Sequence, residues 1–557
     1  MQSLHGTDTQ VLIAGGGPCG LMLANELGRR GIRCLLVDQK QGTAFNPQAN
    51  ATQARTMEHF RRLGFAHEIR ALGLPPDHAT DIVYMTRYAG YDLARISLPT
   101  AAQAVEKIKS MSGSWSAAEL PHRVSQKFVE AALRRHAESW ASADVRYGWR
   151  LEQFSEVGDG VEATVRPVGE GETVQVRAQF LVGADGPRSS VRRALGIDWE
   201  GETGMSRDFM GGKMFAMYLR APQFLSVLRH PKAWMYVAVN AQRRAFMASV
   251  DGVSEFACHA ALHPGEDADG WGEAEARRIF AELVGTEVPI EVLSTGTWMA
   301  GHALVAKRFQ GGRVFIGGDA AHLFTPTGGL GYNTAVEDAV NLAWKLAAVL
   351  RGQAPLALLD SYEAERKPLA IRNTAYARRF ADSVGLFRAR PELEEASPEG
   401  ERERQLAAEY LDQHARLEFN IPGVTFGGRY DASPVIAKDG TSPPPDEPGI
   451  YVPTACPGGR PPHQWLEDGR SLYDLFGPEW TLLALGDDAP ATDAFESAAA
   501  HVHLDLRVLR LRSERLRALY EAPLALIRPD QIVAWRGSSA GEAAAVLARV
   551  TGRTASP

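Results

Sequence analysis

Apolar residues near the start of the chain occur first as a short run, then at helical spacing, then again as a short run. Val11–Ala14 and Cys34–Val37 are the two runs, and Leu21, Ala24 and Leu27 lie between them. A continuous apolar run of this length is typical of a buried strand, and spacing by three is typical of one helix face. The pattern predicts a strand–helix–strand unit of a parallel sheet, and hence an α/β domain.

The middle of the chain has a different pattern, because its apolar runs are rich in Met, Phe, Trp and Tyr. Such runs predict a separate β-sheet region, whose aromatic side chains either line an apolar pocket or simply form the core. The expected strands are Ile82–Met85, Ile96–Leu98, Lys213–Leu219, Ala233–Val239 and Arg244–Val250. A small antiparallel element is expected from Arg146–Leu151, Val161–Val165 and Val174–Val176.

The last third of the chain ends in a second α/β pattern. The charged segment Pro391–Arg404 predicts a solvated helix and linker, and Pro443–Pro445 marks a boundary. Beyond it, the apolar runs Thr481–Leu485 and Val508–Leu511 alternate with helical spacing. A third, smaller α/β unit is therefore expected at the C-terminal end.

Length and charge narrow the classes of function. With 557 residues the chain is too long for one core, so two or three domains are expected. Its 60 basic and 67 acidic residues give a net charge of −7, which offers no surface for a nucleic acid. No apolar run reaches the roughly 18 residues of a membrane span. The polar segment Met1–Gln10 lacks the features of a signal peptide, so a cytoplasmic protein is expected.

The cysteines and histidines exclude two further kinds of site. Cys19, Cys34, Cys258 and Cys456 are scattered, with no C-x-x-C pair among them. This argues against a disulfide framework or a zinc site and fits a reducing compartment. The histidines show no ligand spacing either, so no metal is expected.

The first glycine-rich turn has the spacing of a dinucleotide-binding fingerprint. Gly15, Gly17 and Gly20 follow the first strand in the pattern G-x-G-x-x-G, and Asp38 closes the second strand. The first glycine permits a tight turn, the second lets the backbone approach a pyrophosphate, and the third lets helix and strand pack. An acidic residue in this place accepts hydrogen bonds from a ribose diol. The cofactor expected is therefore one with free adenosine hydroxyls, as in FAD or NAD.

A second glycine-rich turn follows the predicted strand Val314–Ile316. Asp319 lies just beyond that strand, and the turn Pro326–Asn333 opens an amphipathic helix at 337–350. Glycines let the backbone approach a flat ligand, and a helix start offers free N–H groups and a positive dipole end. The arrangement suits a cofactor that carries hydroxyls and becomes anionic; the alternative is an ordinary strand–loop–helix corner. The polar face of the helix carries Asp338, Asn341 and Lys345.

A third strand ends in the same way. Phe180–Val182 is an apolar run that closes on Gly183–Arg192, in which Asp185 precedes a helix. On its own, Asp185 would be interpreted as the cap of that helix.

Three segments, Gly15–Gly20, Gly183–Arg192 and Gly317–Asp338, occur in the order found in the single-component FAD-dependent aromatic hydroxylases, which the chain resembles over roughly residues 1–385. The tail resembles the phenol hydroxylase branch, whose C-terminal domain is thioredoxin-like. Because the tail has no cysteine pair, a role in structure or subunit contact is expected there rather than a redox role. The tail motifs are Pro461–His463, Asp468–Asp474, Ile527–Asp530 and Ala534–Arg536.

The resemblance implies an α/β fold in which a Rossmann-type FAD-binding domain is interleaved with a β-sheet substrate domain. The thioredoxin-like α/β domain follows. The implied boundaries are 1–79, 107–196 and 297–385 for the FAD-binding domain, 80–106 and 197–296 for the substrate-binding domain, 386–445 for a helical linker and 446–557 for the C-terminal domain.

The resemblance also assigns residues to the cofactor. Asp319 matches the residue that binds the ribityl chain, and Asp185 the one associated with both FAD and the reduced nicotinamide. Arg123 and Gln126 match the pair that flanks the middle of the cofactor. The pyrophosphate and adenosine fall to Gly15, Gly17, Gly20 and Asp38. The segment beside the isoalloxazine contains Pro326, Gly329, Gly331 and Asn333.

One position departs from the family pattern. The family usually has Pro-Arg-Ala where this chain has Pro47-Gln48-Ala49, so an arginine is replaced by Gln48. Arg55 is the nearby candidate to take its place at the pyrophosphate.

The reaction implied by the resemblance is hydroxylation of a phenolic or related aromatic substrate with NADH or NADPH and O₂, by way of a flavin C4a-hydroperoxide. Tyr218, Tyr236 and His302 are candidates for the group that deprotonates the phenol. Two alternatives stay open: a flavin-dependent reductase or dehydrogenase without oxygen insertion, and a non-catalytic FAD-binding interaction protein. Simple phenols and larger polycyclic compounds both remain as substrates, and a homodimer is compatible with the sequence.

Overall fold

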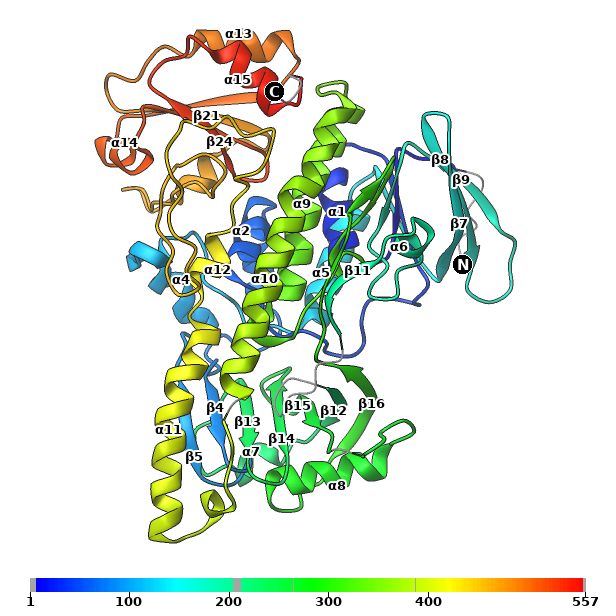
Figure 1. The fold of residues 1–557 in the computed structure, drawn as a ribbon, viewed down its shortest axis with the longest axis vertical. Helices are drawn as coiled ribbons and strands as arrows, with labels where there is room; N and C mark the ends of the chain where they lie inside the picture. Colours follow the sequence, from blue (N-terminus) through cyan, green and yellow to red (C-terminus); the bar gives the residue numbers. More distant parts are fainter. Residues whose placement is uncertain (1–6, 204–211, 264, 386, 554–557) are drawn as a thin grey trace.

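The computed structural model describes residues 7–203, 212–263, 265–385 and 387–553. The polar segment Met1–Gln10 therefore lies partly outside the described residues. Figure 1 shows an elongated molecule with three parts along its long axis. The C-terminal unit lies at one end, an α/β body in the middle, and a large β-sheet at the other end.

The central body is built on a six-stranded sheet whose strands are parallel except for one edge strand. The predicted strand–helix–strand unit lies at its centre, because β2 pairs with both β10 and β3. In sheet order the strands are β18 (Gln310–Gly311), β19 (Val314–Ile316), β10 (Phe180–Gly183), β2 (Val11–Ala14), β3 (Cys34–Asp38) and β6 (Ala143–Tyr147). The main helices on this sheet are α1 (Pro18–Gly28), α5 (Gln126–Ser139) and α9 (Leu330–Leu350).

A four-stranded sheet shares the hydrophobic core of the body, since Val161, Val165 and Val176 pack in one cluster with the central strands. Its order is β1 (Thr7–Asp8), β9 (Val174–Ala178), β8 (Gly160–Pro167) and β7 (Trp149–Val157). The expected strand Arg146–Leu151 is divided between the two sheets. Gly148, with φ of 77°, turns the chain between β6 and β7, a conformation that favours glycine.

Smaller elements complete the body. A three-stranded sheet is formed by β11 (Trp199–Glu202), β17 (Ala303–Ala306) and β20 (His322–Leu323). The helices are α2 (Ala54–Arg62), α3 (Ala66–Arg70), α4 (Ala101–Ser110), α6 (Ser190–Ala194) and α10 (Ser361–Gly385).

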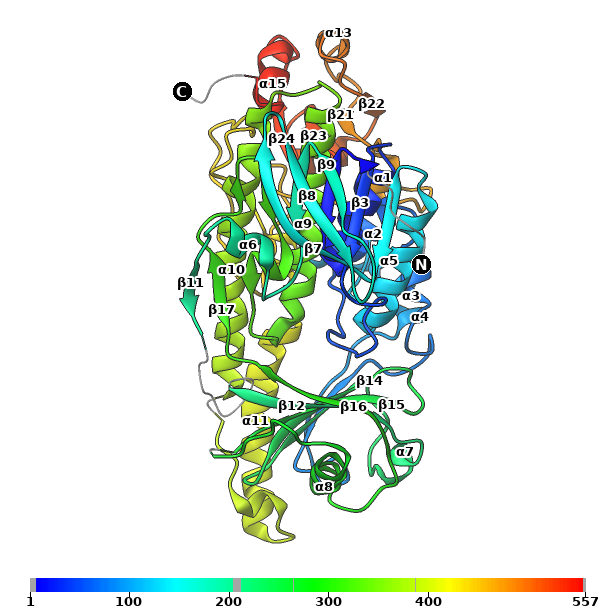
Figure 2. The ribbon, with the colours of Figure 1, turned by 90° about the vertical axis from the view of Figure 1, so that its right-hand side faces the viewer.

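The large sheet has seven strands and two different faces (Figure 2). One face packs against α7 (Phe224–Val227) and α8 (Glu273–Val284), and the other packs partly against α11 (Pro398–Phe419). The expected strand Ile96–Leu98 ends at Ile96, because the next residues turn away and the Leu98 N–H donates to the Asp81 carboxylate. In order the strands are β16 (Glu291–Met299), β12 (Lys213–Arg220), β15 (Glu255–Ala261), β14 (Arg244–Ser249), β13 (Met235–Val239), β4 (Ile82–Met85) and β5 (Asp92–Ile96).

Helix α9 differs from its prediction at its start and on its polar face. It begins at Leu330, inside the glycine-rich segment, rather than near 337. The polar residues Asp338, Asn341 and Lys345 do not face water, because all three are buried against α10 and the C-terminal unit. An amphipathic pattern shows only that two faces differ, and here the polar face is covered by other charged residues.

The C-terminal unit is a four-stranded sheet in which one pair is parallel and the others antiparallel. The strands are β22 (Leu506–Leu511), β21 (Trp480–Leu485), β23 (Leu524–Ile527) and β24 (Val533–Gly537). The helices are α12 (Pro422–Phe426), which precedes the unit, and α13 (Asp493–His501), α14 (Glu514–Tyr520) and α15 (Ala543–Val550). In the part of the chain that the structure describes, no helix combines the length and apolarity needed to cross a bilayer.

Gly20→Ala tests the close packing of the first turn. A Cβ at Gly20 would lie 1.9 Å from the Gly15 carbonyl oxygen and 3.3 Å from Ile13 Cγ2, so the turn or the helix has to move. We expect a loss of about 2 kcal/mol in the free energy of unfolding, measured by urea denaturation. Gly296→Ala on β16 is the control, because no described atom lies within 4 Å of its added Cβ. Equal effects of the two substitutions would contradict the packing argument.

Candidate functional site

The first glycine turn leaves the start of α1 open. Gly17 is the residue before α1, no described side chain caps the helix, and a Cβ added at Gly17 would meet no described atom within 4 Å. The first N–H groups of α1 are therefore available to an anion. Asp38 lies beside this turn, where its two oxygens accept the N–H groups of Gly16 and Lys40 at 2.6 and 2.7 Å. Each oxygen retains a lone pair for a ribose hydroxyl.

The Asp185 turn is packed against the first glycine turn. A Cβ at Gly15 would lie 2.1 Å from the carbonyl oxygen of Ala184, so only glycine allows the two segments to approach this closely. The Asp185 carboxylate accepts hydrogen bonds from the N–H groups of Ser190 and Val191 at 2.7 and 3.2 Å. The cap of α6 is Ser189, whose hydroxyl accepts the Arg192 N–H, so Asp185 is not the cap itself but binds the first two N–H groups of the helix.

Asp319 is the carboxylate with the fewest protein partners in the site. Its side chain keeps an accessible face and accepts no hydrogen bond from the described residues. Protein atoms crowd its other sides, and this loss of water raises the pKa of Asp319, against the opposing effect of His322 and Lys40. A carboxylate that is accessible and has no protein donor can accept hydrogen bonds from the hydroxyls of a ribityl chain.

The turn that carries Asp319 is held from behind by Asp338. The Asp338 carboxylate accepts the Gly318 N–H at 3.0 Å, the His322 Nε2–H at 2.6 Å and the Arg366 Nε–H at 2.8 Å. Burial opposes ionisation of Asp338, but His322 and Arg366 outweigh it and lower its pKa. Asp338 is therefore an ionised carboxylate with no exposed surface, and it sets the position of the Gly318–Asp319 backbone.

The second glycine turn leads directly into α9. Gly328 and Gly329 have φ of 73° and 61°, in the left-handed region where side chains are strained. Gly329 precedes the helix, and none of the described side chains caps it, so the N–H groups of its first turn stay free. Asn333 ties the turn to the chain around α2: its Oδ1 accepts the Gln53 N–H at 2.8 Å, and Gln53 Nε2 donates to the Gly328 carbonyl at 2.7 Å. Pro326 and Gly331 are half-buried at the two ends of this turn.

Arg123 precedes α5 and Gln126 is its first residue, and the two side chains have different surroundings. The Gln126 side chain donates to Glu130 at 2.7 Å, near the Asp38 end of the site. Arg123 is buried at the other end, 4.7 Å above the Trp234 ring, and it donates no hydrogen bond to any residue of the described ranges. Burial lowers the pKa of Arg123 to about 10, with Glu418 opposing. Its donors are thus available to a ligand oxygen.

Glu418 acts electrostatically on Arg123 and contacts the glycine turn directly. Its carboxylate accepts the Gly328 N–H at 3.0 Å. Burial raises the pKa of Glu418 to about 7, against that hydrogen bond and the charge of Arg123.

Arg55 does not replace the missing arginine at Gln48. Its guanidinium is buried and donates to Glu58 and to the carbonyl oxygens of Asp530 and Gln531, so it points toward the C-terminal unit. The expectation that Arg55 contacts the pyrophosphate is therefore wrong. The partner that fixes Arg55 lies 475 residues away in the chain, where no local pattern could reveal it.

The three candidate bases are not brought together. Tyr218 is on β12, where its hydroxyl accepts from Lys127 Nζ at 2.7 Å and donates to Glu255, so both of its roles are filled. Tyr236 lies in the cluster on the α8 face of the large sheet, and burial raises its pKa to about 12. His302 is next to the glycine turn, because its carbonyl oxygen accepts the Thr325 hydroxyl at 3.2 Å. Burial lowers the pKa of His302, which keeps it neutral.

A further histidine, His259, was missed by the sequence analysis. It is on β15, on the face of the large sheet opposite α8, stacked on Phe246 with ring centroids 4.7 Å apart. Trp298 Nε1–H donates to its Nδ1 at 3.1 Å, and burial lowers its pKa to about 4. His259 is therefore neutral with its proton on Nε2, a fixed hydrogen-bond donor. The signal in the sequence is a lone polar residue in the otherwise apolar stretch 256–261.

Comparison with protein families accounts for most of the chain. A model described as an FAD binding domain matches residues 8–377, and a model described as the C-terminal region of aromatic-ring hydroxylases matches residues 454–554. These matches agree with the predicted fold class and cofactor.

Individual relatives are similar over almost the whole length. The chain is 35% identical to aklavinone 12-hydroxylase of Streptomyces peucetius, over 86% of this chain and 91% of that protein. It is 29% identical to 2,4-dichlorophenol 6-monooxygenase of Delftia acidovorans, over 98% of each. Its structure matches that of the rebeccamycin biosynthetic enzyme RebC with reduced flavin, with a TM-score of 0.87 and 33% identity over 99% of this chain and 100% of that one.

Glu418→Gln tests the burial of the carboxyl group next to the glycine turn. Between its ordinary pKa of 4.5 and its folded pKa of about 7, the folded state holds a proton that the unfolded state has released. The free energy of unfolding therefore falls as the pH rises through this range. Glutamine stays neutral and can still accept the Gly328 N–H, so we expect the variant to be more stable than the wild type at pH 8, by up to about 3 kcal/mol.

The gain should be small at pH 5, and both values can be measured by urea denaturation. Glu409→Gln, exposed on the same helix, is the control and should show the same difference from wild type at both pH values. A gain for Glu418→Gln that does not change with pH would show that this carboxyl group titrates normally.

Proposed function

The chain belongs to the FAD-dependent aromatic-ring hydroxylases, and from this premise we propose that its substrate is a planar phenol of more than one fused ring. The enzyme is an FAD-dependent monooxygenase that uses NAD(P)H and O₂ on an aromatic substrate. Bound FAD supplies the reduction and oxygen-activating chemistry. The protein has to bind the cofactor, orient the ring and exclude water.

The residues present fit FAD. We propose that the open start of α1 binds the pyrophosphate, Asp38 the adenosine ribose and Asp319 the ribityl chain. The free N–H groups at the start of α9 would stabilise negative charge on the reduced ring. Asp338 supports this arrangement, since it fixes the backbone next to Asp319 with no exposed surface of its own.

The width of one aromatic surface supports a substrate with several rings. His259 on β15 contacts Phe246 on β14 and, across the intervening strand β12, Trp298 on β16. Trp234, just before β13, packs in one cluster with Phe246 and Trp298. From β16 to β13 is four strand spacings, or about 19 Å. A single phenol ring is shorter than this row of buried and half-buried aromatic side chains.

Two histidines are proposed to act on the substrate oxygens. His302, which is neutral and next to the glycine turn, is the proposed acceptor of the phenol proton. His259 is proposed to orient a second oxygen by donating from Nε2. Tyr218 has both of its hydroxyl roles filled, and Tyr236 lies on the α8 face, so neither is proposed.

The setting of the enzyme is proposed from its surface and its thiols. All four cysteines are free and buried, which suits a reducing cytoplasm. Ile450 and Val452 are exposed apolar residues in the segment before β21 and would fit a homodimer contact.

Asp319→Ala tests the cofactor site. Loss of a carboxylate that bonds the ribityl hydroxyls should weaken FAD binding by roughly tenfold or more. The measurement is a titration of apoprotein with FAD, followed by flavin fluorescence. Asp198→Ala is the control, because the Asp198 side chain is 78% exposed. If Asp319→Ala retains FAD as the control does, the ribityl assignment is wrong.

Substrate class and the role of His302 can be tested in one assay. Fused-ring phenols such as dihydroxyanthraquinones should give a higher kcat/KM for NAD(P)H oxidation than phenol itself, with one ¹⁸O atom from ¹⁸O₂ in the product. His302→Ala should lower kcat/KM by about a hundredfold. Tyr236→Phe should stay within about twofold of wild type. Equal kcat/KM for phenol would refute the fused-ring proposal, and product without ¹⁸O would refute oxygen insertion.

A further inference from the structure

The C-terminal unit makes buried ionic contacts with the helices that carry the flavin-site turns. Its loop Arg528–Gln531 contacts α2, α9 and α10 at once. A purely structural role of the C-terminal unit would require only apolar packing. These contacts are instead hydrogen bonds made by charged side chains, which fix the relative position of the groups they join.

The first route runs through α2. The carbonyl oxygens of Asp530 and Gln531 accept Arg55 Nη2–H at 3.0 and 2.9 Å, and Arg460 contributes a second contact by pairing with Glu58. Arg55 is two residues beyond Gln53, whose N–H and side chain hold Asn333 and Gly328. The segment 51–55 thus lies between the C-terminal loop and the second glycine turn.

The second route runs through α10. Arg528 donates to both oxygens of Glu365, at 2.6 and 2.9 Å. The same carboxylate accepts from Asn341 and Lys345 of α9, both at 2.7 Å. Burial opposes ionisation of Glu365, but Arg528 and Lys345 outweigh it and lower its pKa. All of these side chains are buried, so each charge depends on its partners.

The second route continues to the Asp319 turn. Arg366 follows Glu365 on α10 and donates to Asp338, the carboxylate that holds the Gly318 N–H. Arg366 also donates to the Tyr430 hydroxyl at 3.1 Å and to the Thr334 carbonyl at 3.2 Å, which lies in the first turns of α9. A shift of α10 caused by the loss of Arg528 would therefore move the support of the cofactor turn.

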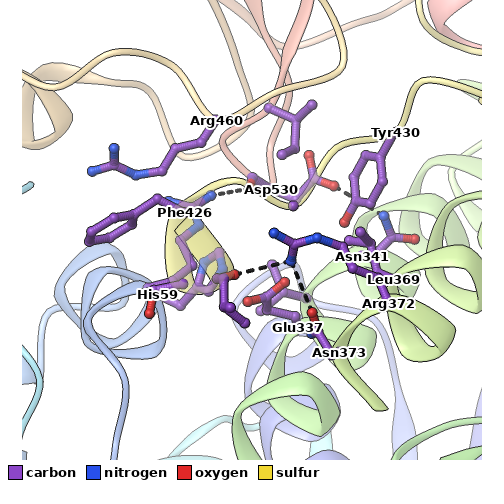
Figure 3. A pocket seen from close by; sticks show the side chains of 16 residues that line it. His59, Glu337, Asn341, Leu369, Arg372, Asn373, Phe426, Tyr430, Arg460 and Asp530 are labelled. Atoms are coloured by element: carbon purple, nitrogen blue, oxygen red, sulfur yellow. Dashed lines mark hydrogen bonds between the residues drawn. The ribbon is translucent and has the colours of Figure 1, made fainter. Parts of the chain in front are cut away.

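Side chains from both routes line a small cavity at their junction (Figure 3). The cavity has a volume of about 30 Å³ and is lined by residues of α2, α9, α10 and α12 and by Arg460 and Asp530. This volume suits about one water molecule. His59 Nδ1 and Thr425 Oγ1 are buried there without a partner among the described residues. A water molecule in the cavity would give these two atoms a hydrogen-bond partner. The contacts thus join elements and do not form a second binding pocket.

We propose that the C-terminal unit is a positioning element for the flavin site: Arg528 and the Asp530–Gln531 backbone fix α10 and α2, and these fix the turns at Gly318–Asp319 and Gly328–Asn333. Arg528 and Arg55 are the positioning residues, and neither touches the cofactor. The inference rests on the assignment of these turns to flavin.

The test uses FAD titrations of full-length apoprotein carrying Arg528→Gln or Arg55→Lys. Arg528→Gln removes the charge that faces Glu365. Arg55→Lys is milder, because lysine can still pair with Glu58 but cannot reach both backbone carbonyls. We expect each variant to bind FAD roughly tenfold more weakly, and to show a shifted visible spectrum of bound flavin. Titrations are made at a temperature at which circular dichroism shows each variant to be folded.

Glu479→Gln is the matched control. Glu479 also belongs to the C-terminal unit and pairs with the body through Arg30 at 2.9 Å, but at the end of α1 far from its glycine turn. It should lower Tm while leaving the FAD dissociation constant within about twofold of wild type.

The outcomes separate positioning from plain stability. If Arg528→Gln and Arg55→Lys lower Tm but bind FAD as tightly as Glu479→Gln, the unit only adds stability and the proposal is wrong. If Arg528→Gln does not fold, the result for Arg55→Lys decides. A wild-type protein that takes up no FAD would instead overturn the flavin site itself, and this is seen before any variant is compared.

Discussion

The structure depends on keeping one fully buried carboxylate, Asp338, ionised. A carboxylate without water is stable only if donors surround it, and Asp338 has three: a backbone N–H, an imidazole and a guanidinium. Two of these donors lie in the turn 318–322 and the third lies on α10, so meeting this one requirement brings that turn and α10 together against α9. The cofactor turn is placed by the same contacts. Stability and function therefore share a single constraint here.

Much of the fold could be predicted because its signals are local. The unit from Val11 to Asp38 has its strands, helix and glycines within 28 residues, and the structure contains it as expected. The start of α9 was harder to predict, since Gly331 and Asn333 are poor helix formers. The helix forms there because Asn333 bonds to Gln53 and Ala51, contacts about 280 residues apart. Tertiary contacts outweighed propensity.

The candidate site divides along the same line. Glycine spacing and strand-end carboxylates are local, so Gly15, Asp38 and Asp319 could be singled out from the sequence. The role of the polar face of α9 could not be predicted, because amphipathic spacing is the same whether a polar face meets water or other charged residues. Asn341 and Lys345 have the spacing of surface residues, but the buried pair of Glu365 and Arg528 covers them. His259 was overlooked because a single polar residue in a strand is usually a core residue.

The contact of Arg55 with Asp530 has a consequence for how the protein is made. The two residues are separated by 475 positions, so almost the entire chain must leave the ribosome before they can meet. Until then the N-terminal half carries several charged side chains that are buried in the finished protein. These side chains still lack their counterions and must stay hydrated. A nascent chain of this enzyme can complete its central sheet once β19 has been made, but it can mature into a fully supported flavoprotein only after synthesis is nearly finished.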